Sequence, residues 1–173
     1  MNAMKELLQD QPYRWISAGV LMRQRGVELG MPNINVFAEY NRLHPEEGHD
    51  RWCDDAIARL AQEDWMICES RLSHYFMPGA FKVLLFCDVE TRAARRQGDL
   101  PGQTLGSVLR EIRERDNNDD KRYAKLYPGC LWEPGKFDAV YNTESLSSQD
   151  IARNLIFAHA HWSERRSMVK GNR

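Results

Sequence analysis

Two arginines and an aspartate recur at helical spacing within the segment "RERDNNDDKRYAKLYP", residues 113–128. Apolar residues at positions 105, 108 and 112 follow the rhythm of a buried helix face, and the same rhythm continues through Arg115, Asp119 and Arg122 before Leu126. Two arginines can hold a phosphate through paired hydrogen bonds, and a carboxylate between them can orient both. The pattern predicts that these two turns cover a polar cavity; a solvated helix end is the alternative.

A second set of polar residues follows the predicted strand at 13–17. Ser17 and Gly19 stand where a helix begins, and Arg23 comes one turn later. A helix N-terminus with a small glycine presents backbone N–H groups that can bind an anion. The alternative is a capping serine followed by a glycine that only permits close packing.

The segment Glu69-Ser70-Arg71 follows the predicted strand at 65–69. A carboxylate at a strand end beside an arginine can hold a metal ion and a phosphate. A surface ion pair is the alternative. After the next strand, Arg92, Arg95 and Arg96 lie on neighbouring helix faces, which is typical of a solvated surface.

These residues are positioned by strands that alternate with helices. Strands are expected at 13–17, 65–69, 81–87 and 138–143, and the apolar run at 81–87 predicts a strand buried on both faces. Helices are expected at 18–30, 46–63, 104–127 and 148–162, and a further helix begins after Asp88. Gly30 would cap the end of the first of these helices, while Asp88 and Thr104 would cap the start of the helices that follow them. The order indicates a three-layer α/β sandwich with a mainly parallel sheet, whose ligands bind at the carboxyl ends of the strands.

Composition indicates one globular domain over residues 1–173. The chain is 42% hydrophobic and 28% charged, with a net charge of −1. No run is long enough to span a membrane and the N-terminus resembles no secretory signal, so we expect a cytoplasmic protein. The charge balance argues against broad nucleic-acid binding but leaves small anionic ligands open.

Cysteine and histidine spacing gives no metal site. Cys53, Cys68, Cys87 and Cys130 form no zinc-type pair, so we expect reduced and mostly buried thiols. His159 and His161 would lie on different faces of a helix. We therefore assign no metal ligands.

Five segments together resemble one family. "RWISAGVLMR", "ICESRL", "KVLLFCDVETRAARR", "RERDNNDDKRYAKLY" and "FDAVYNT" occur in the order found in cytidylate kinases, particularly the compact cytidylate kinase-like proteins. The resemblance extends from about Lys5 to the C-terminal helix. It implies a P-loop nucleoside monophosphate kinase fold that transfers the γ-phosphoryl group of ATP to CMP or dCMP with Mg²⁺.

The resemblance also implies residue roles. The acceptor nucleotide would be bound by Ser17, Gly19, Arg23, Arg71, Arg115, Asp119 and Arg122, of which the last three match an Arg-x-x-x-Asp-x-x-Arg pattern. The catalytic set would be Glu69, Arg115 and Arg122, while Arg92 and Arg96 would lie on the ATP side and the lid. An acceptor-side helical region would cover about residues 26–50, and the lid about 95–122.

The sequence departs from this family in two ways. Ser70 replaces the usual glycine, and no G-x-x-x-x-G-K-[ST] segment occurs in the 173 residues. That loop cradles the donor phosphates, supplies a lysine and holds Mg²⁺. We therefore expect the first strand and the phosphate loop to be missing from this chain, and the acceptor site to be retained.

Three hypotheses remain open. The chain is a kinase read from an internal Met1 or Met4, a non-catalytic nucleotide-binding or regulatory protein, or an interaction subunit whose sheet a partner completes. The family strand order 2-3-1-4-5 makes the missing strand central. We expect the strands at 65–69 and 81–87 to pair directly, or a homodimer to cover their edges.

Overall fold

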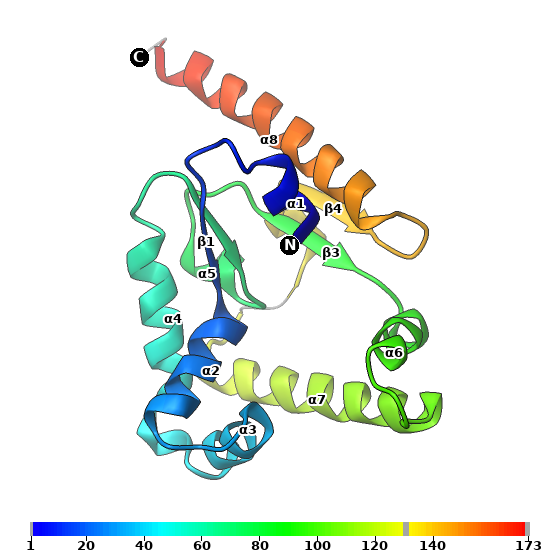
Figure 1. The fold of residues 1–173 in the computed structure, drawn as a ribbon. Coiled ribbons are helices and arrows are strands. Elements are labelled where there is room, and N and C mark those ends of the chain that lie inside the picture. Colours follow the sequence, from blue (N-terminus) through cyan, green and yellow to red (C-terminus); the bar gives the residue numbers. More distant parts are fainter. Residues whose placement is uncertain (1, 130–131, 172–173) are drawn as a thin grey trace. The chain divides into compact units, whose positions relative to one another are not determined.

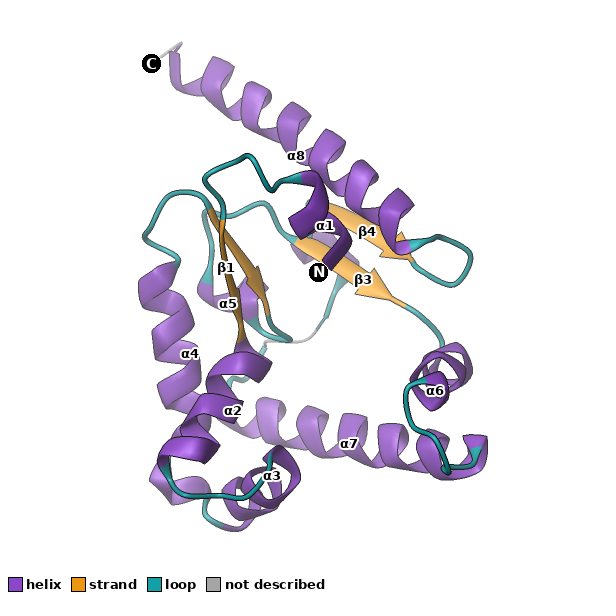
Figure 2. Ribbon diagram, viewed as in Figure 1, coloured by secondary structure: helices purple, strands orange, loops and turns teal. Residues whose placement is uncertain are grey.

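The computed structural model describes residues 2–129 and 132–171. The chain divides into two compact units, Met1–Ala80 and Phe81–Arg173. Both units combine helices with one pair of short parallel strands (Figures 1 and 2).

The first unit places helices around a parallel pair. Its elements are α1 (Asn2–Leu7), β1 (Arg14–Ser17), α2 (Ala18–Glu28), α3 (Ile34–Leu43), the 3-10 helix η1 (Pro45–Glu47), α4 (His49–Leu60), β2 (Met66–Glu69) and α5 (Ser73–Phe76). β1 pairs with β2 in a register that sets Arg14 opposite Met66 and Ser17 opposite Glu69. The two carboxyl ends therefore meet at one edge.

Local sequence explains where the helices of this unit begin and end. Gly30 follows α2 with a φ of 72°, the left-handed conformation that glycine adopts readily. The Asn33 side chain caps α3 by accepting from the backbone N–H groups of residues 35 and 36. The core contains Cys53, Ile57 and Met77. The expected Gly30 cap is confirmed.

The second unit contains a helix pair and a strand pair. Its elements are β3 (Val83–Phe86), α6 (Val89–Gly98), α7 (Leu105–Leu126), the 3-10 helix η2 (Pro134–Lys136), β4 (Ala139–Asn142) and α8 (Ser148–Gly171). α6 packs against α7, and β3 pairs in parallel with β4. The expected caps are present: Asp88 accepts from the Thr91 N–H at 2.6 Å, and Thr104 from the Ser107 N–H at 3.1 Å.

Aromatic contacts hold α8 along the β3–β4 pair (Figure 1). The Phe81 ring lies 5.6 Å from that of His159 and 5.5 Å from that of Trp162, measured between centroids. Trp162 Nε1 donates to Asp138 Oδ1 at 3.1 Å. Burial in this cluster lowers the pKa of His159. The helix continues to Gly171, well beyond the predicted end at residue 162.

All four predicted strands are present, and within the units they pair as β1–β2 and β3–β4. Direct pairing of β2 with β3, or a homodimer that covers their edges, stays a prediction. The prediction that residues 81–87 are buried on both faces is wrong. Leu85 and Phe86 are 49% and 47% exposed, and because successive side chains of a strand point to opposite faces, neither face of β3 is fully covered there. The three-layer sandwich and the absent first strand stay predictions.

The cysteines that the structure describes form no disulfide, and Cys130 lies outside the described residues. Cys53 is buried, whereas Cys68 and Cys87 are partly exposed. Burial raises the pKa of the Cys53 thiol to about 12 and that of Cys68 to about 11, so both are held protonated. None of the helices within the described ranges combines the length and apolarity needed to cross a membrane.

Candidate functional site

The charged turns of α7 bring Arg115, Asp119 and Arg122 together. Arg122 Nη2 donates to Asp119 Oδ1 at 2.7 Å, and Arg115 Nε lies 3.9 Å from Asp119 Oδ2. Each carboxylate oxygen therefore faces a different guanidinium group. We call these three side chains the α7 clamp. Its net charge of about +1 suits an anionic ligand.

Burial within the α7 clamp is uneven. Asp119 is only 8% exposed as a residue and 11% exposed in its side chain, whereas the side chains of Arg115 and Arg122 are 69% and 33% exposed. Val108, earlier on the same stripe, is fully buried. The apolar stripe thus leads to a buried carboxylate that holds two more exposed cations, and this arrangement presents positive charge outward.

Tyr123 contacts the α7 clamp, and the sequence analysis did not predict this contact. Arg122 Nη2 also donates to Tyr123 Oη at 3.1 Å, and the guanidinium carbon lies 4.9 Å from the centre of the Tyr123 ring. The signal in the sequence is an aromatic residue directly after the second arginine. Adjacent residues on a helix do not normally face each other, so spacing alone gave no reason to include it.

The arginines of α6 differ in their surroundings. Arg92 Nη2 donates to Asp116 Oδ2 on α7 at 2.6 Å, a hydrogen bond that raises the pKa of Arg92. Arg95 Nη2 donates to the carbonyls of Thr143 at 2.6 Å and Glu144 at 3.0 Å. Arg96 is exposed, and the described residues offer it no hydrogen bond or ion pair. Arg92 and Arg95 therefore bridge elements of this unit. The predicted solvated surface is confirmed for Arg95 and Arg96, which are exposed, while Arg92 is partly buried.

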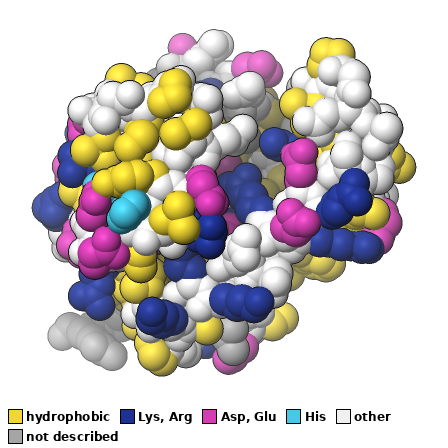
Figure 3. Space-filling view, turned by 90° about the horizontal axis from the view of Figure 1, so that it is seen from below, with side chains coloured by type: hydrophobic (Ala, Val, Ile, Leu, Met, Phe, Trp, Pro, Cys, Tyr) yellow, Lys and Arg dark blue, Asp and Glu magenta, His cyan; other side chains and the backbone are white. Residues whose placement is uncertain are grey.

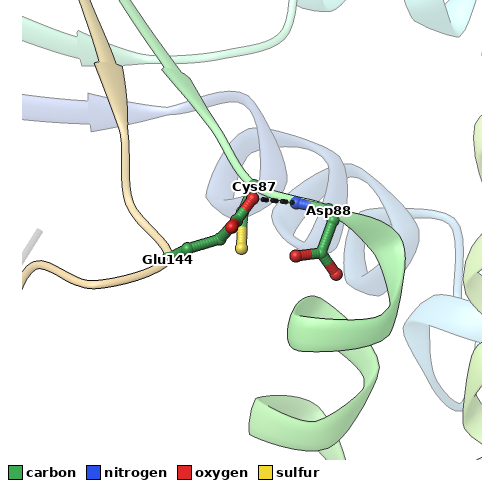
Figure 4. A group of neighbouring side chains, drawn as sticks. All are labelled: Cys87, Asp88 and Glu144. Carbon is green, nitrogen blue, oxygen red and sulfur yellow. Dashed lines mark hydrogen bonds between the residues drawn. The ribbon is translucent and has the colours of Figure 1, made fainter.

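A group with metal-ligand chemistry lies where β3 and β4 end. Single ligand atoms of Cys87, Asp88 and Glu144 lie within 4.8 Å of one another. Figure 4 shows the Glu144 carboxylate directed at the backbone N–H of Asp88, which donates to it at 3.2 Å. The Asp88 carboxylate accepts from the backbone and hydroxyl of Thr91, which lower its pKa. This carboxylate is occupied as a helix cap.

In the first unit, Ser17, Gly19 and Arg23 gather at the start of α2. A Cβ atom added to Gly19 would lie 3.4 Å from Arg23 Nη1 and 3.6 Å from Ser17 Oγ. Ser17 occupies the N-cap position, but its side chain makes no capping hydrogen bond. Arg23 is exposed and has no hydrogen bond or ion pair among the residues described. A serine hydroxyl and a guanidinium group therefore flank the helix N-terminus.

Glu69 ends β2 directly opposite Ser17 in the strand register. It is exposed, while Arg71 is partly buried. The Ser70 hydroxyl accepts from the Leu72 N–H at 3.1 Å, and the Ser73 hydroxyl donates to the Ser70 carbonyl at 3.4 Å. Ser70 thus has a local role in the turn that follows β2.

The predicted site residues therefore form one group in each unit. Ser17, Gly19, Arg23 and Glu69 lie at the carboxyl edge of β1 and β2, and Arg115, Asp119 and Arg122 lie on α7. On the face seen in Figure 3, Lys and Arg side chains are interspersed with Asp and Glu. Such a mixed surface does not favour broad electrostatic capture of a polyanion, which needs an excess of one sign of charge.

Comparison with characterised proteins gives a consistent result. The chain is 32% identical over 135 residues to a cytidylate kinase from Thermococcus sibiricus, an alignment that covers 76% of this chain and 66% of that protein. It is 30% identical over 145 residues to one from Archaeoglobus fulgidus, with 83% and 78% covered. A cytidylate kinase from Pyrococcus abyssi is 27% identical over 162 residues, with 93% and 87% covered. No family model matches the chain.

Proposed function

This chain belongs to the cytidylate kinase family, and from that premise we propose that it binds CMP or dCMP as the acceptor of a phosphoryl group from ATP. The observation that carries the proposal is the α7 clamp, in which a buried carboxylate holds two more exposed arginines. Burying a carboxylate is costly unless charged partners compensate, and here the compensating guanidinium groups remain accessible to an anionic ligand.

The chemistry of the α7 clamp suits a nucleoside monophosphate. Arg115 and Arg122 would donate to the phosphate oxygens, and Asp119 would orient both guanidinium groups and accept from the nucleoside. During transfer, the same arginines would stabilise the charge on the acceptor phosphate, which makes them catalytic as well as binding residues. We place this helix in a lid region of about residues 95–122.

Residues of the first unit are proposed to contact the acceptor nucleotide on the strength of the family resemblance. Arg23 and Arg71 would bind the phosphate, with Ser17 and Gly19 against the nucleotide. The close approach of Arg23 to Gly19 supports this assignment, since its guanidinium group pairs with none of the described residues and lies at a helix N-terminus, which favours an anion. The helical region of about residues 26–50 would cover the acceptor side.

ATP and Mg²⁺ are implied by the family. Glu69 fits a magnesium site, because it is an exposed carboxylate at a strand end and Mg²⁺ is often held by one or two carboxylates together with substrate phosphates. Bound Mg²⁺ would neutralise charge on the donor phosphates. Arg96 is the better candidate for ATP contact, because Arg92 is already bound to Asp116.

Binding measurements test the proposal. Titration calorimetry should show that the chain binds CMP more tightly than cytidine, and Arg122→Ala should cost about 1.5–3 kcal/mol of CMP binding, the scale of a charged hydrogen bond. Arg113→Ala is the matched control, since Arg113 lies on the same helix and pairs with Glu90 at 2.7 Å. Equal affinity for CMP and cytidine would overturn the proposal.

A second candidate is a nucleotide-binding or regulatory protein without kinase activity. The observation that favours it is the lack of a G-x-x-x-x-G-K-[ST] segment in these 173 residues. A coupled assay tests this candidate. CMP-dependent ATP turnover by the chain in the usual kinase range of about 1–100 per second would contradict it and support the enzyme.

A further inference from the structure

The Arg122 side chain is held by two side chains of its own helix. Its Nη2 atom donates to Asp119 Oδ1 at 2.7 Å and to Tyr123 Oη at 3.1 Å. A terminal guanidinium nitrogen carries two hydrogens, so these two bonds account for both hydrogens of Nη2. That nitrogen therefore acts as the internal anchor of the guanidinium group.

The Tyr123 contact adds a restraint that Asp119 alone does not give. A hydrogen bond from one nitrogen to a carboxylate restrains the position of that nitrogen more than the orientation of the guanidinium plane. The Tyr123 hydroxyl provides a second fixed point, and the ring lies 4.9 Å from the guanidinium carbon, within cation–π distance. Because Tyr123 is itself partly buried, its ring is held by the surrounding structure.

This restraint has a functional consequence if Arg122 binds a phosphate. An arginine loses much rotamer freedom when it binds, and a guanidinium group that is fixed beforehand loses less. We infer that Tyr123 is a positioning residue that holds Arg122 in place for the 5′-phosphate of a nucleoside monophosphate. The inference rests on the proposed function. Tyr123 acts through Arg122 and need not touch the ligand.

A purely structural role for Tyr123 makes a different prediction. Truncating a partly buried ring would lower the stability of the chain, and it would weaken the binding of CMP and cytidine equally. A positioning role affects only the ligand that carries a phosphate. The ratio of CMP affinity to cytidine affinity therefore distinguishes the two roles.

The test compares Tyr123→Phe and Tyr123→Leu in the full chain, with CMP and cytidine as ligands in calorimetry. Tyr123→Phe keeps the ring and loses the hydroxyl, so CMP affinity should fall about two- to tenfold while cytidine affinity stays constant. Tyr123→Leu, which also loses the ring contact, should reduce CMP affinity further. Tyr141→Phe is the control, because it removes a tyrosine hydroxyl on β4 that donates to the Asn154 carbonyl at 3.5 Å. Its ratio of CMP affinity to cytidine affinity should equal that of the wild type.

A double variant completes the design. Adding Tyr123→Phe to Arg122→Ala should change the ratio no further, because the residue acts through Arg122. An additional loss in that background would overturn the inference. So would a wild-type preference for CMP that survives both Tyr123 substitutions, and this result would leave the proposed function standing. Equal binding of CMP and cytidine by the wild type would overturn both.

Discussion

Replacing Asp119 tests whether the α7 clamp contributes to stability as well as to binding. This carboxylate is 8% exposed and accepts from Arg122 Nη2 at 2.7 Å. Asp119→Ala would leave that guanidinium group without its closest anion. We expect the free energy of unfolding to fall, and the contribution of each arginine can be worked out from its geometry.

The Arg122 interaction dominates. A hydrogen bond between charged groups contributes about 1.5–3 kcal/mol, and the 33% exposure of the Arg122 side chain reduces this by solvent screening to about 1–2 kcal/mol. The Arg115 side chain is 69% exposed, and its Nε atom lies 3.9 Å from Asp119 Oδ2. In a helix, a base that precedes an acid by four residues makes a weaker ion pair than the reverse order, so Arg115 adds only about 0.2–0.5 kcal/mol. Asp119→Ala should therefore cost about 1.2–2.5 kcal/mol.

Asparagine at the same position refines the estimate. Asp119→Asn keeps an oxygen that can accept from Arg122 and removes only the charge, so we expect roughly half the loss, about 1 kcal/mol. Urea unfolding followed by circular dichroism measures both variants, and an unchanged m-value shows that the comparison is valid.

The matched control is Asp120→Ala on the neighbouring position of α7. Asp120 is exposed, and the described part of the chain offers it no ion pair, so its removal should change stability by no more than about 0.5 kcal/mol. If Asp119→Ala proves no more costly than Asp120→Ala, the reasoning from burial and hydrogen bonding is refuted.

Two further predictions concern Gly30 and His159. Gly30→Ala should lower the free energy of unfolding in urea by about 1–2 kcal/mol, because Gly30 has a φ of 72° that alanine adopts only with strain. Gly98→Ala is the control and should be neutral or stabilising, since Gly98 has open space where a Cβ atom would be added. Equal effects of the two substitutions would contradict the strain argument. Burial lowers the pKa of His159 in the folded state. Above the unfolded-state pKa of about 6.5, the imidazole is neutral in both states and the fold keeps its full stability. As the pH falls below that value, the unfolded state binds a proton more readily than the folded state, so the free energy of unfolding decreases. His159→Gln should flatten the acid-side decline in melting temperature while His161→Gln, on an exposed side chain, should not; identical pH profiles for all three proteins would disprove it.

Local sequence was sufficient for features that depend on nearby residues. Asp88 and Thr104 cap their helices as predicted, since a capping side chain reaches only two or three residues ahead. The i, i+3, i+4 spacing likewise indicated that Arg115, Asp119 and Arg122 share a face, because helix geometry determines which side chains are neighbours. The strand positions followed from short apolar runs in the same way.

The tertiary structure decided which charges find partners and which side chains are buried. Arg92 binds Asp116, 24 residues away, and Arg95 binds the Thr143 carbonyl, 48 residues away; no local pattern encodes such pairs. The exposure of β3 was also beyond the sequence, since an apolar run shows what a strand can bury and its neighbours determine what it does bury. Within the α7 clamp, periodicity treats all three charged residues alike. Only the packed chain makes Asp119 the buried member, because a carboxylate can be taken from water where two guanidinium groups compensate its charge.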